Sequence, residues 1–108
     1  IGIGTDNSGS IRIPAAFNGV FGLRPSMGLI SQNGIFPAGN LDGTAGPLTL
    51  TVTDLAEVMD VIAQINPNDP KTVPVPREKR YSDYLNQQGL KGKRIGIVHL
   101  VGQRDVFK

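Results

Sequence analysis

Hydrophobic positions at helical spacing single out one clear helix, between residues 51 and 65. Four apolar residues of this run recur at i, i+3, i+4 and i+7 and so share one helix face: Leu55, Val58, Met59 and Ile62. Thr51 and Asp54 match a capping box, with Thr accepting from the first-turn amides and Asp reaching back. We therefore predict a helix here, stopped by the proline-containing residues 66–70.

Two short apolar runs predict strands at opposite ends of the chain. The opening IGIG is typical of the end of a buried strand, and KRIGIVHLV, residues 93–101, predicts a second buried strand after a basic turn. The run YSDYLNQQGL predicts a short helix that ends at Gly89. The resulting order is strand, irregular stretch, helix, connector, short helix, strand, which is an α/β pattern.

Glycine and proline punctuate the intervening sequence. Pro14 predicts a structural boundary, because its ring disfavours helix at the preceding residue. In residues 18–51, apolar runs are interrupted every few positions, which favours extended segments and turns over helix. A stretch this long without regular structure is uncommon unless it lines a site. Residues 66–79 read as a proline-rich, extended surface connector.

Composition narrows the class of protein. The 108 residues contain 39% apolar side chains, as in globular proteins, and no cysteine, which excludes disulfides and thiolate chemistry. The net charge of +2 is uneven, with two basic and six acidic side chains in residues 1–70 and nine and three in residues 71–108. The basic half lacks an aromatic stacking platform, so a solvated face is favoured over nucleic-acid binding. No run is long and apolar enough to span a membrane.

Several common site motifs do not match the sequence. A dinucleotide-binding fingerprint would need glycine where Asn7 stands, and a phosphate loop needs a lysine, yet none precedes Lys71. The α/β-hydrolase elbow fails around Ser10, because both of its flanking glycines are absent. The single histidine, His99, is expected to pack within its strand, and no metal site is predicted.

The polar bend GTDNSGS after the first strand is the remaining candidate. Successive backbone amides of residues 7–10 can converge into a concave nest that favours an anion or a developing oxyanion. Gly9 removes the Cβ that would crowd this nest, and an Asp6–Arg12 ion pair would join the two shoulders of the loop. From the residues alone, a polar turn whose serines bond their own backbone is favoured over a nucleophile at Ser10.

Two long runs carry a resemblance to a known family. GTDNSGSIRIPAAFNGVFGLRPSMG, followed by LDGTAGPLTLTVTDLAEVMDVI, resembles the amidase signature family, whose usual run is Gly-Thr-Asp-x-Gly-Gly-Ser-Ile-Arg-x-Pro-Ala. GLKGKRIGIV resembles that family's next core strand. GLISQNGIFP and RYSDYL favour its peptide-amidase-like bacterial members over the glutaminase-type subunit of tRNA-dependent amidotransferases, which usually shows YGRVSR around Leu29 to Gln32.

The resemblance implies an α/β fold in which this chain holds part of a mixed β-sheet sandwiched by helices, incomplete by itself. Residues 1–108 would be a fragment of one domain. Residues 1–70 would hold the nucleophile loop, a site-lining stretch and a helix, residues 71–90 a connector and short helix, and residues 91–108 a core strand and the segment after it. Its partners would be the missing N- and C-terminal parts of its own domain, and exposed sheet edges would favour self-association.

The resemblance also implies roles for individual residues. The family cleaves or transfers at amide C–N bonds with a Ser, a second Ser in a cis peptide and a Lys, and no cofactor is predicted. Ser10 matches the nucleophile, whereas Thr5, Asp6 and Arg12 match positions that brace the loop. The residues whose amides match the oxyanion hole are Asn7, Ser8, Gly9 and Ser10.

Two departures from the family pattern and one further candidate residue qualify this picture. Ser8 replaces the first glycine of the family's pair, which strains the loop if that position requires positive φ. The family's Lys and cis-peptide Ser lie N-terminal to the nucleophile loop, and no lysine here matches: Lys71, Lys79, Lys91, Lys93 and Lys108. The isolated chain is therefore predicted to be inactive. Asp42, in LDGTAGP, is a candidate to approach the substrate, although a turn-capping role is favoured.

The predicted function is amide hydrolysis through a serine acyl-enzyme, performed by the full-length protein on a small-molecule or peptide amide. One alternative is a non-catalytic truncated remnant or interaction module. The other is the glutaminase component of an amidotransferase, which feeds ammonia to a partner. We expect a cytoplasmic protein with no nucleic-acid or membrane partner.

Overall fold

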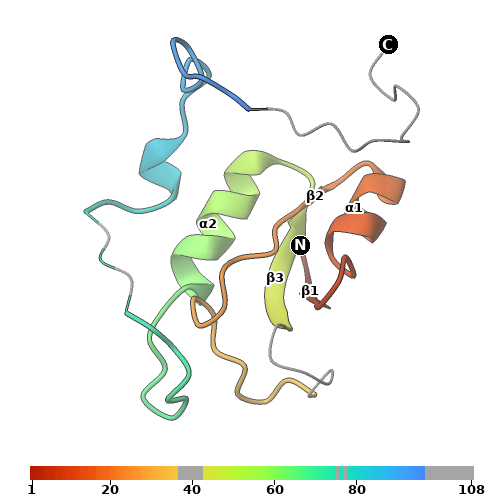
Figure 1. The fold of residues 1–108 in the computed structure, drawn as a ribbon, viewed down its shortest axis with the longest axis vertical. Helices are drawn as coiled ribbons and strands as arrows, with labels where there is room; N and C mark the ends of the chain where they lie inside the picture. The colour runs from red at the N-terminus through yellow and green to blue at the C-terminus, as the bar shows by residue number, and fades with distance from the viewer. Residues whose placement is uncertain (37–42, 75, 77, 97–108) are drawn as a thin grey trace.

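A short antiparallel sheet with a helix along each side forms the ordered centre of the molecule (Figure 1). The structure, a computed structural model, describes residues 1–36, 43–74, 76 and 78–96. Its elements are β1 (Gly2–Asp6), α1 (Arg12–Asn18), β2 (Phe21–Gly22), β3 (Thr44–Thr49), α2 (Val52–Ile62) and the 3₁₀ helix η1 (Ser82–Tyr84). The α/β class is confirmed for this part of the fold. No helix of the described residues is long and apolar enough to cross a bilayer.

The central strand of the sheet was not foreseen as a strand. β3 pairs antiparallel with both β1 and β2 in the order β1-β3-β2, and Asp6 at the end of β1 lies opposite Thr44. The carbonyl of Pro47 accepts a hydrogen bond from Leu23 N at 3.1 Å. Because the N–H and C=O of a strand residue face the same neighbour, the donor that proline lacks lies on this side, where β2 has ended. A proline is therefore tolerated inside a central strand.

The helix α1 corrects the prediction of a boundary at Pro14. The helix begins at Arg12, and Pro14 occupies its first turn, where a missing N–H costs no helical hydrogen bond. Gly19 ends the helix in the left-handed conformation with φ 63°, and its N–H donates to the carbonyl of Ala15. The helix is consequently short and fixed at both ends, directly after the polar bend.

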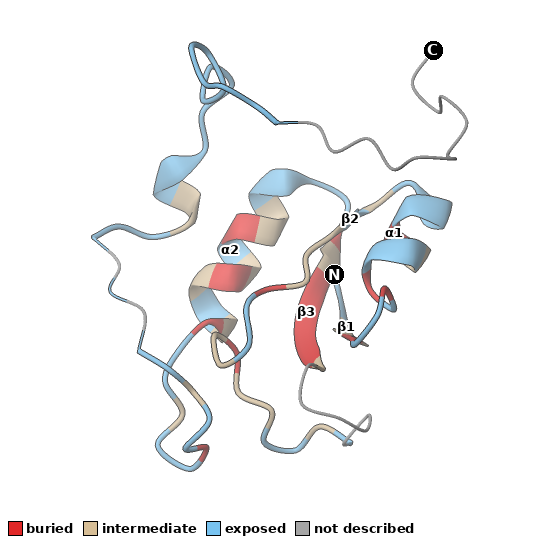
Figure 2. Ribbon diagram, viewed as in Figure 1, coloured by how far each residue is buried: buried red, intermediate tan, exposed pale blue. Residues whose placement is uncertain are grey.

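The predicted helix is confirmed as α2, with bounds shorter than the apolar run. Thr51 is its N-cap and accepts from Asp54 N at 3.0 Å, so this half of the capping prediction is confirmed. The helix ends at Ile62, before the prolines expected to stop it. Met59 is the most buried residue of α2 and packs with Ala45 of β3 and with Ile30. Figure 2 shows buried stretches in both α2 and β3. This cluster is one part of the buried core; Ile11, which is 0% exposed, and Ala15 are buried outside it.

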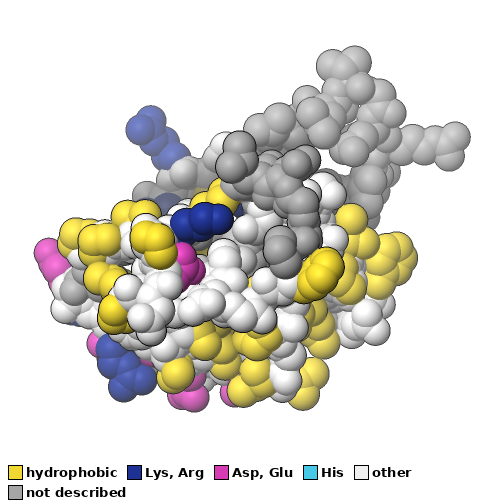
Figure 3. Space-filling model, turned by 90° about the horizontal axis from the view of Figure 1, so that it is seen from below, with side chains coloured by type: hydrophobic (Ala, Val, Ile, Leu, Met, Phe, Trp, Pro, Cys, Tyr) yellow, Lys and Arg dark blue, Asp and Glu magenta, His cyan; other side chains and the backbone are white. Residues whose placement is uncertain are grey.

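The first strand is less buried than IGIG predicts. Ile1 is 86% exposed and Ile3 is 58% exposed, and Phe17 on α1 is also exposed. Hydrophobic side chains gather in several patches on the face seen in Figure 3. β1 is an edge of the described sheet, and the other described residues leave its outward side chains largely uncovered.

The C-terminal third differs most from expectation. Residues 66–72 are not an extended connector but a turn in which Asp69 is buried and accepts from Ser31 Oγ and Gln32 N, both at 2.8 Å. The helix expected to reach Gly89 is only the single turn η1. Asp60 of α2 accepts hydrogen bonds from Tyr81 and Ser82 at the start of this turn. Among the described residues, no side chain of α2 holds the segment after Tyr84 in the same way. The described residues 93–96 form no strand, and His99 lies outside the described residues.

Candidate functional site

The polar bend connects the end of β1 to the start of α1. It therefore leaves a sheet edge and enters a helix within residues 7–11. Ser10 and its neighbours Asn7 and Ser8 are exposed, whereas Gly9 is buried. The hydroxyl expected to act as a nucleophile is thus on an accessible residue, immediately before a helix that holds the bend in place.

Asp6 organises this bend from a fully buried position, with 0% of the residue exposed. Its Oδ1 accepts from Gly9 N at 2.6 Å, and its Oδ2 accepts from Ile11 N at 3.1 Å and Arg12 N at 3.3 Å. The N-cap residue Ile11 has no capping side chain, so Asp6 satisfies the first amides of α1 from five and six residues upstream. A single carboxylate therefore fixes both the bend and the helix after it.

The predicted ion pair between Asp6 and Arg12 is present. Arg12 Nε lies 3.0 Å from Oδ2 and Arg12 Nη2 lies 3.3 Å from Oδ1, so the guanidinium contacts both carboxylate oxygens. The hydrogen bond from Arg12, together with the three backbone amides, holds the pKa of Asp6 well below its usual range although burial acts to raise it. Asp6 in turn raises the pKa of Arg12. Both groups are charged at any pH near neutrality.

A second arginine near Asp6 was missed from the sequence. Arg24 Nε lies 3.8 Å from Asp6 Oδ1, and its side chain is 25% exposed, compared with 56% for Arg12. A signal was present, because Arg12 and Arg24 are the only basic residues among the first 70. A carboxylate destined for burial beside a strand end needs cationic partners, and only these two were available nearby in sequence.

Gly9 is the tight position in the bend. Its φ is 138°, and a Cβ there would meet Ile13 Cδ1 at 2.6 Å. Ser8 stands where the family pattern has glycine, and its side chain is exposed, so its size meets no obstacle in the described chain. The positive φ at residue 9 therefore favours glycine, and a Cβ there would also have to displace the Ile13 side chain.

The remaining predicted residues divide into three kinds. Thr5 lies in β1 opposite Ala45, half-buried, one residue before Asp6. The amide of Gly9 points to Asp6, whereas within the described residues the amides of Asn7, Ser8 and Ser10 have no hydrogen-bond acceptor. Asp42 lies outside the described residues.

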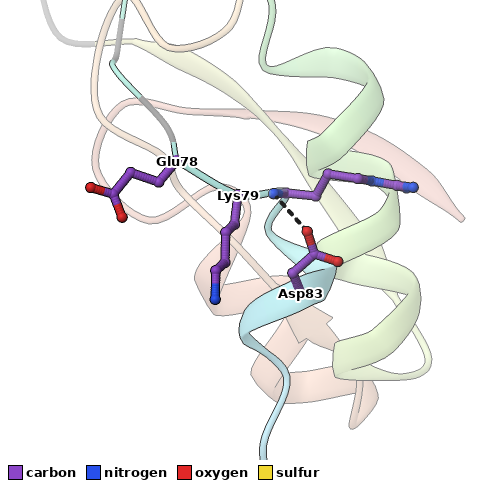
Figure 4. A pocket seen from close by; sticks show the side chains of 4 residues that line it. Glu78, Lys79 and Asp83 are labelled. Atoms are coloured by element: carbon purple, nitrogen blue, oxygen red, sulfur yellow. Dashed lines mark hydrogen bonds between the residues drawn. The ribbon is translucent and has the colours of Figure 1, made fainter.

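A different hollow, of about 350 Å³, lies beside η1, and the described residues that line it are all charged: Glu78, Lys79, Arg80 and Asp83. Figure 4 shows the Glu78 and Lys79 side chains extending apart, while Asp83 accepts from Arg80 N at 3.0 Å. In Figure 1, η1 lies on the opposite side of α2 from α1. This hollow contains no serine and is separate from the bend that holds Ser10.

Comparison with known proteins places the segment in context. The family model described as Amidase matches residues 1–106. A probable amidase of Arabidopsis thaliana is 39% identical over 101 residues, covering 91% of this chain and 20% of the relative. A glutamyl-tRNA(Gln) amidotransferase subunit of Cenarchaeum symbiosum is 38% identical over 96 residues, covering 89% of this chain and 19% of the relative.

Solved structures agree with the sequence relatives. A native peptide amidase from Stenotrophomonas maltophilia superposes with a TM-score of 0.77 and 45% identity, over 84% of this chain and 19% of that one. The chain spans about a fifth of the length of the curated relatives it matches. The fold described above is therefore similar to one part of these larger proteins.

Proposed function

The chain belongs to the amidase signature family, and from that premise we propose that it carries the nucleophile segment of an amide C–N hydrolase, with Ser10 as the attacking residue. The observation that supports this most is the exposed Ser10, held in a bend that the buried Asp6 fixes through three backbone amides.

The proposed reaction proceeds through an acyl-enzyme. Ser10 Oγ attacks the amide carbonyl carbon and loses its proton to a base, and the carbonyl oxygen becomes an oxyanion. Collapse of this intermediate expels the amine, which takes a proton, and water then releases the acid and restores Ser10. The amides of Asn7, Ser8 and Ser10 are the donors proposed for the oxyanion, while the Gly9 amide, bound to Asp6, keeps the bend in shape.

A serine needs a base, and the described residues do not bring one to the bend. In the proposal, a desolvated neutral Lys takes the proton through a second serine hydroxyl, as the family resemblance implies. Both groups come from polypeptide outside these 108 residues. The isolated chain would then hold the nucleophile alone and turn nothing over.

A glutaminase role within an amidotransferase is the second candidate. It is supported by the 38% identity to a glutamyl-tRNA(Gln) amidotransferase subunit. Both candidates share the acyl-enzyme chemistry and differ in the acyl donor and in the fate of the ammonia. Release of ammonia from glutamine, compared with release from a panel of peptide and small carboxamides, separates them.

The direct test is covalent labelling in the complete protein. A serine-directed fluorophosphonate should modify Ser10, and the Ser10→Ala variant should resist labelling and lose amide hydrolysis. Ser8→Ala is the matched control, because it removes an exposed hydroxyl from the same bend and leaves every backbone amide in place. Labelling that persists in Ser10→Ala would contradict the assignment.

The apolar surface of β1 and α1 is proposed to pack against the rest of the same domain. Its exposed side chains include Ile3 of β1 and Ile13 and Phe17 of α1, the two elements that the bend connects. Soluble proteins rarely leave such side chains clustered at an edge. Covering them would also remove bulk water from beside Ser10.

A further inference from the structure

The position of Arg24 is determined by the contact of its segment with strand β3, whereas its guanidinium faces the polar bend. Arg24 lies two residues after the end of β2, and its neighbour Leu23 donates its N–H to the Pro47 carbonyl of β3 at 3.1 Å. The contact is unusually close at Gly46, where a Cβ would meet the Leu23 carbonyl oxygen at 2.0 Å and Pro25 Cδ at 3.0 Å. Glycine at residue 46 is therefore what lets this segment lie on β3.

The guanidinium of Arg24 faces the oxygen of Asp6 that controls the bend. Its Nε is 3.8 Å from Oδ1, which is the oxygen that accepts from Gly9 N at 2.6 Å. The Gly9 N–H belongs to the Ser8–Gly9 peptide, and Ser10 is the next residue. Displacement of Oδ1 would thus turn the backbone that directly precedes the nucleophile.

The two arginines at Asp6 differ in where they are anchored. Arg12 binds both carboxylate oxygens, but it belongs to α1, which Asp6 itself caps, and it moves with the bend. Arg24 is held on β3 through its neighbours and is the less exposed of the two, so its charge is less screened by water. It therefore ties the carboxylate to a rigid element.

We propose that Arg24 is a positioning residue for the nucleophile: it fixes Oδ1 of Asp6 against the sheet and thereby sets the orientation of the Gly9–Ser10 backbone. The inference rests on the proposed function, because it concerns the rate at which Ser10 is acylated. It adds to that function a residue outside the polar bend, on a different segment of the chain.

The test measures acylation in folded, complete protein, well below its melting temperature. Arg24→Met should slow fluorophosphonate labelling of Ser10 by at least tenfold and lower kcat on an amide with little change in KM. Arg24→Lys, which keeps the charge, should recover most of the rate. Arg80→Met is the matched control, because Arg80 also pairs with a buried aspartate, Asp60, at 3.2 Å, but beside η1. It should change the melting temperature without changing the labelling rate.

A double-mutant cycle separates positioning from general destabilisation. In an Asp6→Asn background, Arg24→Met should cause no further slowing, because its effect acts through that carboxylate. Additive effects, equal slowing by Arg80→Met, or wild-type labelling in Arg24→Met would each overturn the inference while leaving Ser10 as the nucleophile. If Ser10→Ala is labelled like the wild type, the proposed function itself fails. Arg24→Gln replaces Arg24→Met in the cycle if the latter does not fold.

Discussion

Replacing Asp6 by asparagine removes the charge at the centre of the bend and keeps the shape of the side chain. The carboxylate oxygens serve different donors. Oδ1 accepts from Gly9 N and from Arg12 Nη2, whereas Oδ2 accepts from Ile11 N, Arg12 N and Arg12 Nε. Asparagine has a single carbonyl oxygen, so it can replace only one of these acceptors, and its NH₂ group faces donors at the other.

The structure indicates which hydrogen-bond acceptor Asp6→Asn loses and how much free energy that loss costs. The asparagine oxygen satisfies more donors at the Oδ2 position, so its NH₂ faces the Gly9 N–H. A hydrogen bond to a charged group contributes about 1.5–3 kcal/mol, and Arg12, which is 56% exposed, regains water and adds little. A loss of about 2–3 kcal/mol in holding the Ser8–Gly9 peptide, which directly precedes Ser10, corresponds to acylation slowed roughly 30- to 150-fold.

Fluorophosphonate labelling of Ser10 in the complete protein measures this rate. Asp60→Asn is the control, since Asp60 is also buried, with a side chain 5% exposed, and accepts from Tyr81 N at 2.6 Å and Ser82 Oγ at 2.6 Å. It should lower the melting temperature and leave labelling unchanged. The reasoning is refuted if Asp6→Asn labels within twofold of the wild type, or if Asp60→Asn slows labelling as much.

Three further outcomes are expected from the structure. Gly46→Ala should destabilise the fold by about 3 kcal/mol in denaturant unfolding, because its Cβ would meet a backbone oxygen of Leu23, whereas Gly43→Ala meets nothing within 4 Å and should be neutral. Burial acts to raise the pKa of Asp60, but hydrogen bonds from Ser82 and the Tyr81 amide lower it to about 2 from a usual 3.8. Its contribution to stability should be complete above pH 4 and lost as the pH falls towards 2, so wild type and Asp60→Asn should converge there in urea unfolding. The isolated chain should self-associate with increasing concentration in sedimentation velocity, and a monomer at every concentration would contradict an uncovered apolar edge.

Local signals predicted the parts of the fold that local interactions determine. The helix α2 combines apolar periodicity with the Thr51 cap, and both survive in the structure. The strand β3 was missed because Gly46 and Pro47 are typical of turns, and only contacts with β1 and Leu23 make them strand residues. Similarly, α1 was missed at Pro14, since the cap that starts this helix is a side chain five residues before its N-cap. Both errors come from tertiary contacts that override local preference.

The candidate site was predictable in the same uneven way. The polar bend and the Asp6–Arg12 pair lie within nine residues of sequence, so motif and charge pattern were sufficient to propose them. Arg24 lies near Asp6 because β2 pairs with β3 and returns the chain to the sheet. The spacing of residues along the sequence does not reveal that pairing. No lysine of this sequence matches the base of the proposed mechanism.

Three aspartates in the described chain hold backbone segments through hydrogen bonds, and the differences between them bear on which one lies beside a functional site. Asp6, Asp60 and Asp69 each accept from backbone amides, and each has a pKa below its usual value. Asp60 anchors η1 to α2, and Asp69 joins the 66–72 turn to Ser31 and Gln32, so both tie surface segments to one another. Asp6 alone of the three is wholly buried between two arginines, and the peptide it holds precedes an exposed serine. A loop that only had to close would not need its backbone fixed by so much buried charge, which costs desolvation. The arrangement at Asp6 supports the proposal that these amides are held in place beside a reacting Ser10.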